Sequence, residues 1–201
     1  MKSPINWPKG LSYQDYLLQV NQLVADGLTS GPTQDEFLSN FTRLNAHRMK
    51  RLGKTVKLLE MWDQFLPNLQ KSYTWRVFTE AWCGDAAQIL PVLQAIGLSS
   101  GGKITLEVFY RDEDPELFSH FLTGDSKAIP KLVAIDNNSG EQIGTWGPRP
   151  SALQDIVLAH KENPQVSHSE LVEQLQRWYN EDGTRQIQEE IFRSLQTWEK
   201  K

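Results

Sequence analysis

The amino-acid sequence predicts an α/β protein whose strands lie in the middle of the chain, between two helical segments. Apolar residues recur at helical spacing through the first third of the 201 residues and again after residue 164. Between these segments the period changes, and short runs of β-branched and aromatic residues alternate with helical patterns. Hydrophobic residues make up 39% of the chain, and its seven tryptophans add to the material for a packed interior.

The first third is expected to hold three helices after an irregular N-terminal segment that Trp7 anchors. Ser12 with Asp15 resembles a capping box, and Thr33 with Glu36 forms a second cap signature. The expected helices run from Ser12 to Gly27, from Thr33 to Gly53, and from Thr55 to about residue 66, where Pro67 predicts a kink or a stop.

The middle of the chain is expected to follow the order β-α-β-α-β-β-α. Asn137 to Gly140 is a strong hairpin turn signal between the last two strands. The expected strands are Tyr73–Thr79, Ile104–Tyr110, Lys131–Ile135 and Gln142–Trp146, and the expected helices run from Cys83 to Gly97, from Pro115 to Leu122, and onward from about Pro150.

Two amphipathic helices are expected after Pro164, separated by Asp182 and Gly183. Tryptophans at such spacing most often pack onto a parent domain or a second subunit, so these helices are interpreted as structural wrapping. The domain organisation expected from these patterns is a helical N-terminal extension over residues 1–71, an α/β domain over 72–161, and a helical C-terminal extension over 162–201.

Composition argues against several classes of function. The net charge of −4 and the isoelectric point near 5.6 give no reason to expect nucleic acid as a partner. No apolar run approaches the roughly 20 residues that span a bilayer, and the N-terminus lacks the apolar core of a signal peptide. A single cysteine excludes an intrachain disulfide, so we expect a protein of the reducing cytoplasm with no membrane partner.

The basic run from Arg43 to Lys57 contains no acid and is the strongest local charge anomaly. A solvated helix face is the commoner explanation, and a site for phosphate or an acidic partner is the alternative. The four histidines show no zinc-like ligand spacing, so no metal is predicted.

Cys83 stands at a sharp turn between the first central strand and the helix that follows. An exposed position at a helix start would favour a thiolate, because free backbone N–H groups and the helix dipole stabilise negative charge there. Asp85 is a like charge that opposes part of this effect, and it also suits a helix start. The alternative for Cys83 is an inert buried thiol. Glu80 is expected to be a solvated acid at the strand end, with a proton-accepting role as the alternative.

The turn Trp82-Cys83-Gly84-Asp85-Ala86, the segment Ala128-Ile129-Pro130-Lys131 and Gly147 after the last strand together resemble the thioredoxin family, over about residues 72 to 161. The segments WCGDAAQILPVL and TWGPRP are similar to sequences of a bacterial subgroup of this family that has added N-terminal helices. The resemblance implies a thioredoxin-like fold, a mixed sheet flanked by helices, with a cis Pro130 against Cys83. It also implies that the Ile129 backbone is available to a partner's extended chain.

Two departures from the family pattern bear on activity. Ala86 replaces the second cysteine of Cys-x-x-Cys, so a mixed disulfide at Cys83 must be released by another molecule. Val77 stands where the family commonly has a buried acid, so a proton-transfer role there is not expected to carry over.

The favoured function is monothiol thiol–disulfide exchange, with Cys83 as the reacting group and no cofactor beyond glutathione as a candidate co-substrate. Protein thiols or disulfides, or glutathione, are the expected partners, and the expected binding residues are Trp82, Gly84, Asp85, Ile129 and Pro130. Two alternatives stay open: a peptide-binding or chaperone-like module that uses no redox chemistry, and a peroxide-sensing thiol.

Overall fold

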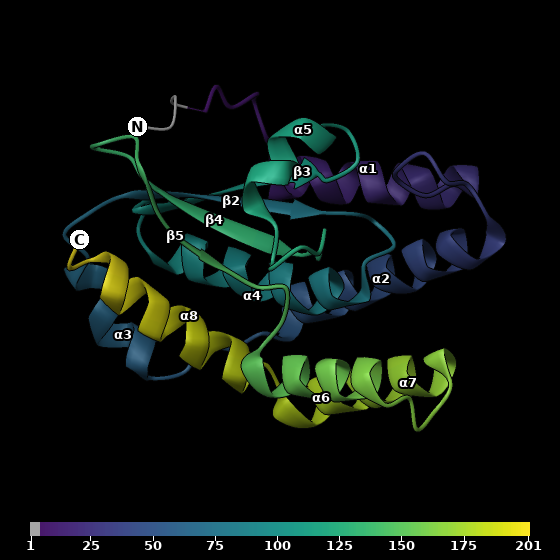
Figure 1. Cartoon of the computed structure of the whole chain (residues 1–201). Helices are drawn as coiled ribbons and strands as arrows, with labels where there is room; N and C mark the ends of the chain where they lie inside the picture. Colours follow the sequence, from purple (N-terminus) through teal and green to yellow (C-terminus); the bar gives the residue numbers. More distant parts are fainter. Residues whose placement is uncertain (1–4) are drawn as a thin grey trace.

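The computed structural model describes residues 5–201 as a five-stranded mixed sheet covered by helices (Figure 1). The strand order is β1-β3-β2-β4-β5. Strands β2 and β3 run parallel, and the three other neighbouring pairs run antiparallel. The strands are β1 (Leu11–Ser12), β2 (Tyr73–Thr79), β3 (Ile104–Tyr110), β4 (Lys131–Asp136) and β5 (Gln142–Trp146).

The helices occupy both ends of the chain and the connections between strands. Helices α4, α2 and α8 lie on one side of the sheet, and α5 lies on the other (Figure 1). Their bounds are α1 (Tyr13–Asp26), α2 (Glu36–Thr55), α3 (Met61–Phe65), α4 (Gly84–Ser99), α5 (Pro115–Phe118), α6 (Ser151–Glu162), α7 (His168–Asp182) and α8 (Arg185–Trp198), with short 3₁₀ turns at Leu66–Asn68 and Ser119–Phe121.

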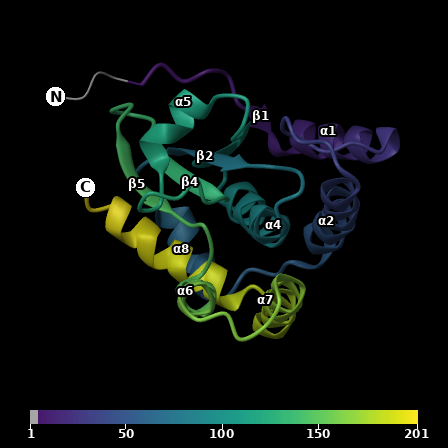
Figure 2. The same cartoon turned by 45° about the vertical axis from the view of Figure 1, so that its right-hand side comes forward.

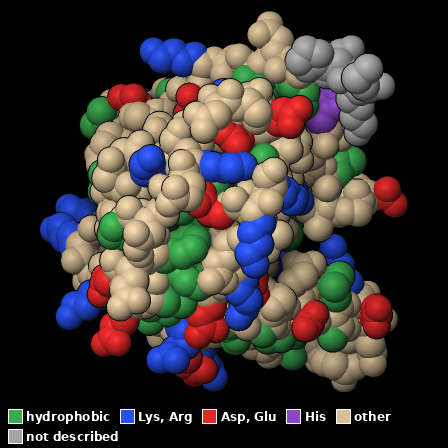
Figure 3. All heavy atoms as spheres, turned by 90° about the vertical axis from the view of Figure 1, so that its left-hand side faces the viewer, with side chains coloured by type: hydrophobic (Ala, Val, Ile, Leu, Met, Phe, Trp, Pro, Cys, Tyr) green, Lys and Arg blue, Asp and Glu red, His purple; other side chains and the backbone are tan. Residues whose placement is uncertain are grey.

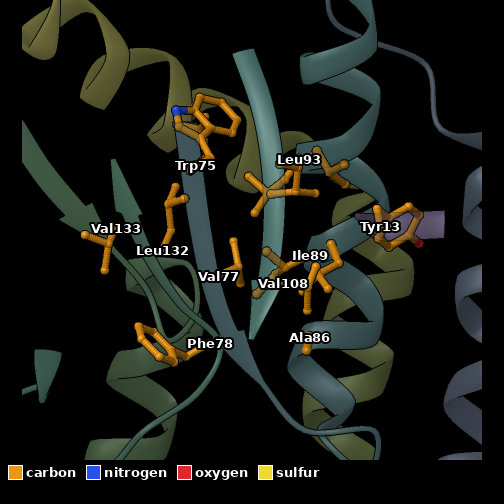
Figure 4. Packing of buried hydrophobic residues seen from close by; sticks show 14 of the residues in the cluster. Tyr13, Trp75, Val77, Phe78, Ala86, Ile89, Leu93, Val108, Leu132 and Val133 are labelled. Carbon is orange, nitrogen blue, oxygen red and sulfur yellow. The ribbon is translucent and has the colours of Figure 1, made fainter. Parts of the chain in front are cut away.

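Strand β2 lies at the centre of the core. Its side chains alternate between the two faces of the sheet, so Val77 points towards Ile89 of α4 while Phe78 points to the opposite side (Figure 4). Both side chains are buried, as expected for a central strand covered by helices on both faces. Strand β2 therefore delivers the turn that follows it, residues 80–83, to the start of α4.

Aromatic residues fill the face of the sheet opposite α4. The Trp7 ring lies 5.1 Å from the ring of Phe121 and 5.8 Å from that of Phe78, centroid to centroid. The guanidinium of Arg76 lies 4.5 Å from the centroid of the Trp7 ring. The prediction that Trp7 anchors the N-terminal segment is confirmed, and residues 1–4 of that segment lie outside the described residues.

The predicted boundaries of the first third need several corrections. Strand β1 was not expected, because a two-residue strand has too short a pattern to detect. Helix α2 is capped by Asp35, whose carboxylate accepts a hydrogen bond from the Leu38 N–H at 2.7 Å, and it continues past Gly53 to Thr55. The expected third helix begins only at Met61 and gives way to the 3₁₀ turn that contains Pro67.

The C-terminal helix α8 packs its apolar side onto the molecule. Ile187, Ile191 and Leu195 are completely buried. Phe192 meets Trp62 of α3 edge to face, with 5.2 Å between ring centroids. The packing predicted for α8 is therefore observed. Gly183 ends α7 with a left-handed backbone, at the break between two helices that the sequence predicted.

On the molecular face in Figure 3, Lys and Arg are interspersed with Asp and Glu, so this face carries no field of a single sign. Across residues 5–201, no helix is both long and apolar enough to cross a membrane.

Candidate functional site

The turn after β2 places Cys83 directly before the first residue of α4. The Cys83 N–H donates to the Glu80 carbonyl at 3.0 Å, which closes the turn, and the Cys83 carbonyl accepts from the Ala87 N–H at 3.2 Å, which opens the helix. The extended backbone of Cys83, with φ of −74° and ψ of 110°, is typical of an N-cap residue. This local geometry confirms the predicted place of the cysteine at a helix start.

The thiol of Cys83 is buried against the loop before β4. Its side chain is only 6% exposed, and its Sγ donates to the carbonyl oxygen of Ile129 at 3.5 Å. The Ile129–Pro130 peptide bond is cis, as the family resemblance implied. The expectation of an exposed thiol was wrong, because the Ile129 loop and the neighbouring helices cover the start of α4.

Burial raises the pKa of the Cys83 thiol to about 12, and the negative charge of Asp85 acts in the same direction. The N–H groups of Ala86 and Asp85 and the charge of Arg149 act in the opposite direction, but they are outweighed. The expected thiolate is therefore not the resting form of this site. The N–H groups at the helix start stabilise a Cys83 thiolate as predicted, but desolvation by burial destabilises it by more.

Asp85 joins three elements at the start of α4. Its Oδ2 accepts from Arg149 Nη2 at 2.5 Å and from Arg149 Nε at 3.0 Å, and its Oδ1 accepts from the Tyr179 hydroxyl at 2.8 Å. Both side chains of the ion pair are mostly buried. The desolvated ion pair fixes the loop before α6 against the start of α4, and the Tyr179 hydroxyl attaches α7 to the same carboxylate.

Gly147 lets this loop pass close to the cis proline. Its φ of +107° lies in a region that side chains disfavour, and a Cβ there would lie 2.4 Å from the Pro130 carbonyl oxygen. Only glycine fits this contact between the two loops. The Gly147–Pro148 peptide bond is also cis.

Glu80 is completely buried, so the expectation of a solvated acid was wrong. Its carboxylate accepts from the Ser30 hydroxyl and from the Asp112 N–H, the latter at 2.9 Å. Burial raises its pKa, and the hydrogen bond from Ser30 lowers it in part. Its partners are the loop between α1 and α2 and the end of β3, so Glu80 ties these segments together.

A cavity of about 490 Å³ opens beside Cys83. Residues of α2, of α7 and of the start of α4 line it. Figure 2 shows these three helices close to one another. Its apolar walls come from Phe37, Leu38 and Phe41 of α2, Val157 of α6, and Leu171, Val172 and Leu175 of α7. The ionisable side chains of its lining are mostly basic, with Asp85 as the one acid lining it in the described chain; the basic ones are Arg48, Arg111, Lys127, Arg149, His160, Lys161 and His168.

Most of the predicted site residues meet at this cavity. Trp82, Cys83, Gly84, Asp85 and Ile129 all line it. Pro130 follows Ile129 on the buried side of the loop. The Trp82 ring lies under the Arg111 guanidinium, 5.2 Å from centroid to Cζ.

Other residues of the cavity were not predicted as site residues from the sequence. Arg48 was considered only as part of the basic run from Arg43 to Lys57, and Tyr179 only as part of an amphipathic helix after Pro164. The apolar wall of α7 was interpreted as general wrapping, because periodicity shows that a helix buries one side but not what that side meets. The run without acids between Thr42 and Leu59 was the one available signal for Arg48.

The sheet order, a cysteine capping the helix after the central strand, and a cis proline beside its thiol define a thioredoxin-like protein with a single cysteine. A family model described as thioredoxin matches residues 31–182, so the chain belongs to the thioredoxin family. The matched range extends from the loop before α2 to the end of α7 and therefore includes both of these helices, which line the cavity.

Solved structures share this fold at low sequence identity. An HIV epitope scaffold is 18% identical with a TM-score of 0.54, over 95% of this chain and 99% of that chain. A Pseudomonas aeruginosa protein of unknown function is 18% identical with a TM-score of 0.55, over 93% of this chain and 96% of that chain. Likeness at this level shows the fold alone. No curated protein matches the sequence.

Proposed function

We propose that this thioredoxin-like protein carries out monothiol thiol–disulfide exchange through Cys83. The observation that carries the proposal is the place of the thiol, which caps α4, donates to the Ile129 carbonyl at 3.5 Å and lines an open cavity. A disulfide that enters the cavity meets this sulfur and no second cysteine. Release by an external thiol such as glutathione suits a reducing compartment, and we include a cytoplasmic location in the proposal.

The exchange has two balanced steps. In the first, the Cys83 thiolate attacks one sulfur of a disulfide, so that a mixed disulfide forms and the other sulfur leaves as a thiolate. In the second, an external thiolate attacks the substrate sulfur of the mixed disulfide and releases the Cys83 thiolate. The net reaction transfers one half of the disulfide to the external thiol, and the protein returns to its starting state.

The raised pKa of Cys83 sets the conditions for the first step. Desolvation is its main cause, so water or a polar ligand that enters the cavity lowers the pKa towards its ordinary value. Below pH 12 or so, the thiolate fraction of Cys83, and with it the exchange rate, rises about tenfold for each unit of pH. A thiolate of high pKa is also intrinsically a stronger nucleophile.

A second candidate function is binding without redox chemistry. The burial and the raised pKa of Cys83 favour this alternative, because a protonated thiol is a poor nucleophile. In that case the thioredoxin fold supplies a cavity, and Cys83 is part of its lining.

The deciding experiment measures the glutathione-dependent reduction of hydroxyethyl disulfide at several pH values. Under the exchange proposal, the wild type accelerates the reaction and Cys83→Ser abolishes the acceleration. A companion variant, Ala86→Cys, rebuilds the two-cysteine motif and is expected to add reduction of insulin disulfides.

As a control, the protein is incubated with hydroxyethyl disulfide in the absence of glutathione, and intact-mass spectrometry then detects any mixed disulfide. The single cysteine makes the result unambiguous, since only Cys83 can carry the added mass of a mixed disulfide. If the wild type forms no adduct and is no faster than Cys83→Ser between pH 7 and 10, the exchange proposal fails and the binding alternative stands.

A further inference from the structure

The cavity beside Cys83 combines an apolar interior with an excess of positive charge. Phe37 and Phe41 of α2 stack edge to face at 4.8 Å between centroids, and Phe37 is 59% exposed. Leu171 and Leu175 of α7 belong to the same lining. So large an exposed aromatic surface inside a cavity favours an aliphatic or aromatic ligand.

Two of the cationic groups are already neutralised. Arg149 is paired with Asp85, and Arg111 holds Asp112 through two hydrogen bonds of 2.7 and 2.8 Å. Asp112 lies outside the cavity lining. These pairs leave the other cations of the lining to set its charge.

Arg48 is the cation best placed to receive an anion. Its Nη1 donates to the Asn45 amide oxygen at 3.0 Å, and no ion pair of Arg48 occurs among residues 5–201. A Cβ on Gly84, the first residue of α4, would lie 3.6 Å from the same nitrogen. The guanidinium therefore lies beside the N-terminus of α4, and both carry positive charge. Burial and the neighbouring Arg51 lower the pKa of Arg48, and the charge of Asp85 offsets this only in part, so a further anion at Arg48 relieves an unfavourable charge.

We infer that this cavity binds a small amphipathic carboxylate, with its hydrocarbon part against α2 and α7 and its carboxylate at Arg48. A volume of about 490 Å³ suits a small molecule. The inference goes beyond thiol exchange and does not depend on it, because the contacts that select the ligand come from Arg48 and the apolar walls. A protonated Cys83 also leaves the cavity free of a further negative charge that would repel the ligand.

The test uses octanoate and its neutral analogue octanamide, titrated calorimetrically into the full-length Cys83→Ser variant. Octanoate is expected to bind at least about tenfold more tightly, because a hydrogen-bonded charge at Arg48 exceeds a neutral contact by 1.4 kcal/mol or more. Arg48→Gln should remove this difference and leave octanamide binding unchanged. The matched control is Arg43→Gln, which removes an exposed arginine of the same helix outside the cavity and should change neither affinity.

A variant of the opposite wall and the reactivity of Cys83 provide two further tests of carboxylate binding. Val172→Asp adds an acid to the opposite wall and should weaken octanoate binding more than octanamide binding, with the circular dichroism spectrum unchanged. In the wild type, octanoate should slow the alkylation of Cys83, because it occupies the cavity and adds negative charge beside the thiol.

The outcomes separate this inference from the exchange proposal. Equal affinity for the acid and the amide, no binding of either, or equal losses from the Arg48 and Arg43 variants would overturn the carboxylate site. A dimer in analytical ultracentrifugation that dissociates on Val172→Asp would also overturn it, since a second copy would then fill the cavity. Octanoate binding without any mixed disulfide at Cys83 would support the inference and contradict only the exchange proposal.

Discussion

Asp85 is the acid that acts most strongly on the Cys83 thiol. Its carboxylate also holds Arg149 and the Tyr179 hydroxyl, so the same side chain fixes the site and makes the thiol harder to ionise. The two roles have different physical origins. The first depends on hydrogen bonds, which an amide can partly replace, and the second depends on net charge, which an amide lacks.

Asp85→Asn should therefore lower the pKa of Cys83 and destabilise the fold. The alkylation rate at pH 8 should rise by at least tenfold, because one source of negative charge is lost and Arg149 becomes an unpaired cation nearby. The unpaired, mostly buried Arg149 should cost about 3 kcal/mol of unfolding free energy. Iodoacetamide kinetics followed by mass spectrometry and urea denaturation measure the two effects.

Asp155→Asn is the matched control, since Asp155 is an exposed acid of α6. It should change neither the alkylation rate nor the stability. An alkylation rate for Asp85→Asn equal to that of the control would show that Asp85 does not set the pKa of the thiol.

At the scale of single residues, the position of the site could be predicted from the sequence, but the burial of its side chains could not. The place of Cys83 at a helix start follows from a local pattern, because a strand, a turn and a helix are all encoded by neighbouring residues. Burial of Glu80 could not be predicted, because its partner Ser30 is 50 residues away in the chain. Solvation depends on distant segments, and no local pattern reports it.

Helix α7 forms one side of the cavity beside Cys83. It contributes Leu171, Val172 and Leu175 to one wall, and the Tyr179 hydroxyl attaches it to Asp85 at 2.8 Å. This hydrogen bond connects α7 directly with the residue that helps set the pKa of the thiol. Weaker attachment of α7 should therefore change the reactivity of the Cys83 thiol.

Tyr179→Phe should cost about 1.5–3 kcal/mol of stability, because a hydrogen bond to the charged Asp85 carboxylate is lost. It should also speed the alkylation of Cys83, since α7 then holds less firmly over the cavity. The matched control is Tyr110→Phe. The Tyr110 hydroxyl is buried without a hydrogen-bond partner among residues 5–201, so its removal should be neutral or stabilising. Equal effects of the two variants on stability would contradict the role assigned to Tyr179.

At the scale of elements, long periodic segments were predicted well. The bounds of β2, β3 and β5 agree with the expected ranges, because alternating and β-branched residues mark buried strands directly. The two residues of β1 are too few to show a period. The contact of α7 with the site is a tertiary property, which periodicity does not contain.

The hydrophobic core extends over the whole molecule. It includes Tyr16 and Met49 from the N-terminal third, Val77 from the central strand, and Ile191 and Trp198 from the last helix. The helices at both ends of the chain therefore share one core with the sheet. The segments predicted from composition shifts differ in pattern, but the buried cluster runs through all three.

Trp198→Ala should accordingly destabilise the entire fold. The indole covers Gly144 of β5 so closely that a Cβ there would lie 1.9 Å from its Nε1. Loss of this buried ring should cost about 3–5 kcal/mol. The control is Leu98→Ala, whose side chain is 72% exposed and should contribute little. A single cooperative urea transition, shifted as a whole in Trp198→Ala, is the expected result, and a separate early transition of α8 would contradict a shared core.

The short β1 and the covered β5 have a consequence for self-association. These two strands are the outer edges of the sheet, where unpaired backbone groups invite another chain to add a strand. One edge ends after two residues, and at the other the Lys201 ammonium donates to the Ile143 carbonyl at 2.5 Å while α8 lies alongside. Both edges of the sheet therefore disfavour pairing with a strand of another chain. The segments responsible come from the two ends of the chain, so these terminal extensions also protect the protein against aggregation.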